Sequence, residues 1–154
     1  MSSIKFYSKL IDEICLLTRN LYTLFLESQM EPIRALSGFL LLKYTGIIIK
    51  LLVALANDEV PPMAEKTSEL ELSKIKEPRD RFSDVCWLIV NMFKLASITQ
   101  DKQKRNELLL LLNRAENIYL DLVLSAILHE GVDNDKVDEE LTKIKEELQE
   151  VIKV

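Results

Sequence analysis

Residues 35–56 read ALSGFLLLKYTGIIIKLLVALA, and this stretch decides the fold class. It is either a membrane-spanning helix or an apolar helix inside a soluble protein. Its twelve Leu, Ile, Phe and Val residues favour insertion by about 4–7 kcal/mol, while Lys43 and Lys50 oppose it by about 5–7 kcal/mol. The two lysines are seven residues apart, so they share one face of a helix. We therefore expect a largely buried helix at the centre of a helical bundle, with both ammonium groups reaching water.

The composition points to an all-α protein. The 154 residues include 48% hydrophobic and 29% charged residues, which is typical of a folded domain. Only 3 Gly and 4 Pro are present, too few for the many tight turns of a β-sandwich or barrel. The net charge of -5 gives no overall attraction to nucleic-acid phosphates. The first residues lack the pattern of a secretory signal peptide, so we expect an intracellular, cytoplasmic protein.

Apolar residues recur with helical spacing along most of the chain. This periodicity predicts a single helical domain over residues 1–154, built as a bundle of about five main helices. Gly131 is predicted to end the fourth helix in the left-handed conformation. The predicted helices cover approximately residues 3–29, 32–56, 80–97, 102–130 and 136–153, with a long linker, rich in Pro and charged residues, at 57–79.

No group of residues matches a known catalytic, metal-binding or cofactor-binding pattern. The single histidine, His129, cannot build His-rich zinc or di-iron sites, and no Gly-rich phosphate loop is present. We therefore expect no cofactor and no catalytic residue, and the sequence favours a noncatalytic protein. One alternative is a small enzyme or ligand-binding bundle, which a deep cleft lined by Arg34, Lys43, Glu116 or Asp121 would support. The other alternative is a membrane-associated helical protein.

An excess of apolar helix faces suggests a protein-protein interaction or scaffold subunit. The apolar stripes on the first, second and fourth helices are broader than five helices can cover. We therefore expect a homodimer or a stable assembly with another protein, with the first or the fourth helix at the contact. Gly38 and Gly46 would let a neighbouring backbone approach closely. The candidate interaction residues are the only tryptophan, Trp87, and the polar group Asn113, Arg114 and Asn117.

A weak basic patch is the only feature that points to nucleic acid. It would combine Arg79 and Arg81 with the basic run at Lys102, Lys104 and Arg105. Aromatic residues are not interleaved with these side chains, so base stacking is unsupported. Nucleic acid is therefore a weaker expectation than a protein partner, and a membrane partner is not favoured.

Two further observations concern the environment of the protein. Cys15 and Cys86 are interpreted as buried, reduced thiols, and a disulfide between two helices is the alternative in an oxidising compartment. The bias toward Ile, Leu, Lys and Glu is typical of thermophiles.

In size and helix content, the chain resembles the small subunits of CRISPR effector complexes and the helical domains of GINS replication factors. This resemblance implies a small subunit of a larger nucleoprotein complex and assigns a role to no residue.

Overall fold

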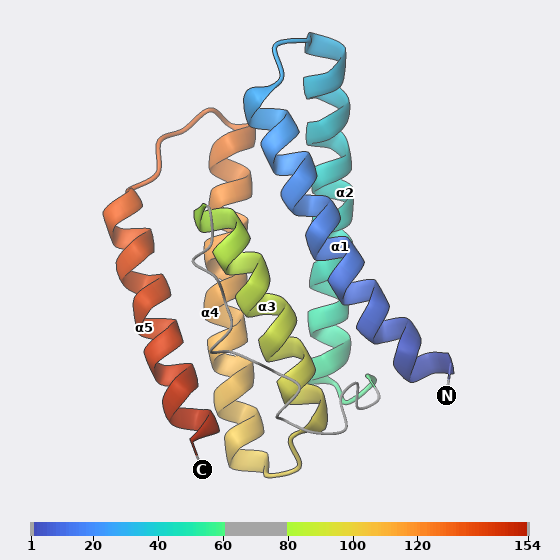
Figure 1. The fold of residues 1–154 in the computed structure, drawn as a ribbon, viewed down its shortest axis with the longest axis vertical. Helices are drawn as coiled ribbons and strands as arrows, with labels where there is room; N and C mark the ends of the chain where they lie inside the picture. The colour runs from blue at the N-terminus through green and yellow to red at the C-terminus, as the bar shows by residue number, and fades with distance from the viewer. Residues whose placement is uncertain (1, 61–79, 154) are drawn as a thin grey trace.

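The computed structural model describes residues 2–60 and 80–153, with side chains for Tyr7 and for residues from 9 onward within these ranges. The described residues form five α-helices and no strand, so the predicted all-α bundle is confirmed. Residues 61–79, which make up most of the predicted linker, lie outside the described part of the chain. The helices are α1 (Ser2–Glu27), α2 (Glu31–Ala56), α3 (Arg81–Ile98), α4 (Lys102–Ile127) and α5 (Asn134–Ile152) (Figure 1).

Aspartate caps explain where three of the helices begin. The carboxylate of Asp80 accepts a hydrogen bond from the Ser83 N–H at 2.7 Å, at the start of α3. Asp101 and Asp133 cap α4 and α5 in the same way. Each carboxylate satisfies a backbone donor that has no partner within the helix, and its charge complements the positive end of the helix dipole.

Two helices end in left-handed residues that are not glycine. At the end of α4, His129 has φ 56°, and the Glu130 N–H donates to the Ser125 carbonyl at 2.8 Å. Asp58 has φ 59° and occupies the same position after α2. This arrangement is a Schellman cap. The prediction that Gly131 takes the left-handed position is wrong, because α4 ends at Ile127 and His129 is then the residue that must turn.

The main packed pairs are α1 with α2, α3 with α4, and α4 with α5, and α3 lies in the middle of the bundle, where it also packs on α1 (Figure 1). In α3, 11 of 18 residues are buried, whereas in α2 only 8 of 26 are buried. The expectation that residues 35–56 form the central, largely buried helix is therefore wrong. The apolar residues of α2 itself point to most sides of the helix, so their spacing does not show which side faces the core. Lys43 and Lys50 are both exposed, as predicted.

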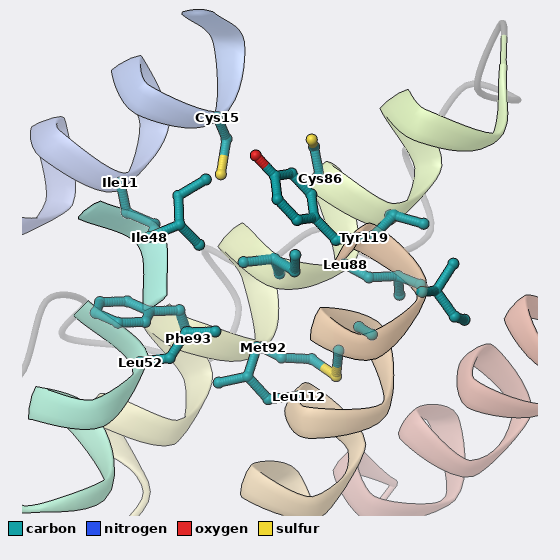
Figure 2. Packing of buried hydrophobic residues seen from close by; sticks show 14 of the residues in the cluster. Ile11, Cys15, Ile48, Leu52, Cys86, Leu88, Met92, Phe93, Leu112 and Tyr119 are labelled. Carbon is teal, nitrogen blue, oxygen red and sulfur yellow. The ribbon is translucent and has the colours of Figure 1, made fainter. Parts of the chain in front are cut away.

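A buried polar connection links α2 and α4 in the core. The hydroxyls of Thr45 and Tyr119 lie 2.7 Å apart, and both residues are buried. Phe82 of α3 packs on the ring of Tyr119, with ring centroids 5.0 Å apart, and stacks on Tyr22 of α1 at 4.0 Å. The three aromatic rings and the Thr45 hydroxyl thus join four helices where they meet. Figure 2 shows Tyr119 among the aliphatic side chains of the same core.

Candidate protein-interaction face

A continuous apolar stripe runs along the outward side of α2. Its members follow one another at alternating spacings of four and three residues, which places them on one face of the helix. Phe39 is 66% exposed, Val53 54% and Leu42 44%. We call this stripe the α2 seam, and it consists of Ala35, Phe39, Leu42, Gly46, Ile49, Val53 and Ala56.

The middle of the α2 seam is open to a close neighbour. A Cβ atom built on Gly46 would have no heavy atom within 4 Å apart from its chain neighbours and the nearby backbone of its own helix. Gly38 differs, because a Cβ there would lie 2.7 Å from the Phe25 ring. Of the two glycines that the sequence predicted at contacts, Gly38 is therefore covered within the bundle. Gly46 remains available to another backbone.

Two lysines border one side of the α2 seam. Lys43 and Lys50 each follow a seam residue directly, so both lie on the same flank of the stripe. Neither lysine has an ion pair with any residue in the ranges 2–60 and 80–153. The flank is therefore positively charged, although the chain as a whole is acidic.

On the opposite side, the α2 seam borders a cavity of about 200 Å³ between α2 and α4. Val53 and Ala56 belong both to the seam and to the wall of this α2–α4 cavity. Glu116 lies at the same cavity, and burial raises the pKa of its carboxyl group above the ordinary value. The other lining residues are Leu52, Leu109, Leu112 and Asn113.

The polar residues Asn113, Arg114 and Asn117 do not form one site, because each lies in different surroundings. Arg114 binds Glu140 of α5, with its Nη2 2.7 Å from Oε1, and it also pairs with Glu147. These ion pairs hold α4 against α5, beside an open groove of about 530 Å³. Asn113 lines the α2–α4 cavity instead, and Asn117 is exposed. The structure thus uses Arg114 within the fold and leaves the two asparagines near the surface.

Trp87 is half-buried beside the two cysteines. All three residues line a cavity of about 250 Å³ between α1 and α3. Both cysteines are free, and the neighbouring Cys86 thiol, together with burial, raises the pKa of the Cys15 thiol. A raised pKa keeps a thiol protonated, so Cys15 is not activated as a nucleophile. In Figure 2 the side chains of Cys15, Cys86 and Tyr119 point toward one another.

The basic residues do not come together as a patch. Arg81 stands at the start of α3 and is held by Asp138, with Nε and Oδ1 2.7 Å apart. Lys102, Lys104 and Arg105 follow the other end of α3, about 27 Å away along an 18-residue helix. Arg105 is 2.7 Å from a carboxylate oxygen of Asp58 and also donates to the Leu55 carbonyl. Arg79 lies outside the described residues.

Features that would support a catalytic or ligand-binding bundle are few. No group of three or more His, Cys, Asp and Glu side chains within the described ranges is arranged to hold a metal ion. Of the four residues expected at a ligand cleft, Glu116 lines the α2–α4 cavity. Arg34, Lys43 and Asp121 line neither that cavity, nor the α4–α5 groove, nor the cavity beside Trp87.

The sequence reasoning missed the α2 seam, although its signal is visible. Seven apolar or small residues at spacings of four and three are present in residues 35–56. In the described part of the chain, α2 alone is long and apolar enough to cross a membrane, and 33% of its most apolar window is buried. No protein-family model, no curated protein and no solved structure matches this chain.

Proposed function

We propose that the chain is a noncatalytic interaction subunit that binds a protein through the α2 seam. The observation that carries this proposal is the exposed stripe of regularly spaced apolar residues with an open glycine at its middle. Single exposed apolar residues are common on any protein, whereas a contiguous apolar surface marks an interface. A regular alternation of three and four residues is the spacing with which one helix packs on another.

Exposed aromatic and aliphatic residues supply the free energy of such an interface. Phe39, Leu42 and Val53 are each about half exposed, so covering them contributes on the order of 1 kcal/mol per side chain. Association itself costs at least about 4 kcal/mol. The seam therefore needs a partner that also covers its borders, including the α2–α4 cavity. A subunit of a larger nucleoprotein complex, as the resemblance in size suggests, is one form of this proposal.

Site-specific photo-crosslinking in the native host tests the proposal. The photoreactive residue p-benzoylphenylalanine replaces Phe39 in one variant and Thr142, an exposed residue of α5, in a control. We expect a discrete protein adduct from position 39 and none from position 142. The additional change Gly46→Lys should abolish the adduct, because a long charged side chain would then stand in the middle of the seam. Equal labelling at both positions would contradict the proposal.

A second candidate is a membrane-associated protein, and the length and apolar character of α2 favour it. In this case the same face would lie against lipid, with Lys43 and Lys50 near the headgroups. The photo-crosslinking experiment separates the two candidates, because position 39 would then label lipid instead of protein. Flotation of the purified chain with neutral and anionic vesicles gives an independent measurement.

A further inference from the structure

We propose that the partner on the α2 seam is a second copy of the same chain, packed antiparallel about a two-fold axis. In this dimer, Phe39 of each copy enters the α2–α4 cavity of the other. The inference rests on the proposed function, because it assumes that the α2 seam is a binding surface. It adds the identity of the partner, the direction of its helix and the residues that meet.

The sizes of the seam residues are complementary to the same stripe read in the opposite direction. In one antiparallel register, Phe39 lies opposite the partner's Ala56, Leu42 opposite the partner's Val53, and Gly46 opposite the partner's Ile49. The largest residue then meets one of the smallest, and the open glycine receives a β-branched side chain. Helices pack closely when large side chains fit beside small ones.

The α2–α4 cavity selects this register. Val53 and Ala56 form part of its wall, and in this register the partner's Phe39 lies beside them. The volume of about 200 Å³ is sufficient for an aromatic ring, because an apolar cavity of about 150 Å³ holds benzene. Shifting one helix by seven residues, the heptad repeat of the seam, would place Phe39 opposite the partner's Ile49, which does not line the cavity, and would leave the cavity unfilled. The two-fold axis repeats the contact, so two rings fill two cavities.

The charged flank predicts how the dimer responds to salt. Two seams that pack antiparallel place the same flanks together, so Lys43 and Lys50 of both copies gather on one side. Salt screens this repulsion and should strengthen the dimer. An acidic partner helix or an anionic membrane would instead bind more weakly as salt rises, because its attraction to the lysines would be screened. Salt dependence therefore distinguishes the dimer from these two other occupants.

Light scattering across a hundredfold dilution measures the dimer directly. We expect a particle of twice 17.8 kDa that dissociates on dilution, with a Kd that falls several-fold between about 0.02 and 0.5 M salt. Phe39→Ala should raise the Kd at least tenfold. Leu110→Ala is the matched control, because Leu110 is 67% exposed on α4 but does not belong to the seam. Circular dichroism should show that both variants remain folded, because neither side chain is buried.

Engineered cysteines test the register, in a Cys15→Ser, Cys86→Ser background. A Leu42→Cys chain mixed with a Val53→Cys chain should form a covalent dimer under mild oxidation, whereas each chain alone should not. Positions 42 and 53 are about 16 Å apart along one helix, which is too far for a disulfide within one chain. Cross-linking of Leu42→Cys with itself would overturn the register.

A monomer at every concentration and salt would overturn the dimer. In that case, a photo-adduct between position 39 and another protein would leave the proposed function standing. The absence of any protein adduct would remove both.

Discussion

Replacing Tyr119 by phenylalanine tests the buried link between α2 and α4. The Tyr119 hydroxyl lies 2.7 Å from Thr45 Oγ1, and both residues are buried. Leaving a buried hydroxyl without its partner costs about 1–3 kcal/mol. Thr45 can turn its hydroxyl toward the carbonyl four residues earlier in α2, which reduces the loss. We therefore expect Tyr119→Phe to lower the free energy of unfolding by about 1–2 kcal/mol.

A double-mutant cycle measures this bond separately from other effects. Thr45→Val removes the other hydroxyl, and the double variant should be more stable than the sum of the two single changes predicts, by about 1 kcal/mol. Urea unfolding followed by circular dichroism gives the four values. Tyr44→Phe is the control at a half-buried tyrosine, and we expect a change of less than about 0.5 kcal/mol. Additive losses in the cycle would refute the reasoning.

The same variant carries a pH signature. Burial raises the pKa of the Tyr119 hydroxyl, so the folded protein keeps it neutral where the unfolded chain begins to ionise, near pH 10. The contribution of this hydroxyl to the free energy of unfolding is fully present below about pH 10. Above that pH it falls by up to about 1.4 kcal/mol per pH unit. Tyr119→Phe lacks this loss. The stability difference between wild type and variant should therefore shrink between pH 9 and 11, and a constant difference would contradict the assignment.

Three further predictions use matched pairs of variants in thermal or urea unfolding at low protein concentration. Gly46→Ala should stabilise α2 by about 0.5–1 kcal/mol, whereas Gly38→Ala should destabilise it by about 1–3 kcal/mol because of the Phe25 ring; effects of the same sign would contradict the packing. His129→Gly should stabilise by about 1 kcal/mol by relieving a positive φ, while Gly131→Ala should change little. Lys145→Met should cost about 1–3 kcal/mol, since it leaves the buried Asp84 carboxylate without an ion pair at 2.6 Å. Lys143→Met, at an exposed pair, should cost less than about 0.5 kcal/mol.

The five helices were predictable because their signals are local. Periodic apolar residues, the aspartates before α3, α4 and α5, and Pro32 in the first turn of α2 all act within a few residues. The end of α4 was harder to predict. Nothing in the local sequence distinguishes a helix that stops at Ile127 from one that continues to Gly131, because the residue that takes the left-handed position of the cap, His129, is not a glycine.

The orientation of α2 and the partners of single residues were not predictable for a different reason. Apolar side chains cover every side of α2, so burial depends on where α1, α3 and α4 happen to pack. In the sequence, Arg114 looks available for a partner protein. In the fold it pairs with Glu140 and Glu147, which lie on another helix and are distant in the sequence. Thr45 and Tyr119 are 74 residues apart, and only the folded bundle brings their hydroxyls together.

The order in which the helices pack has a consequence for folding rate. Helix α1 packs on α2, α3 packs on α4, and α4 packs on α5, so most contacts between helices join segments that are close along the chain. Such hairpins form quickly because little loop entropy is lost. Docking the α1–α2 pair onto the other three helices requires the distant contacts, among them the bond between Thr45 and Tyr119. That bond should therefore form after the main barrier, and losing it should accelerate unfolding while leaving the folding rate nearly unchanged.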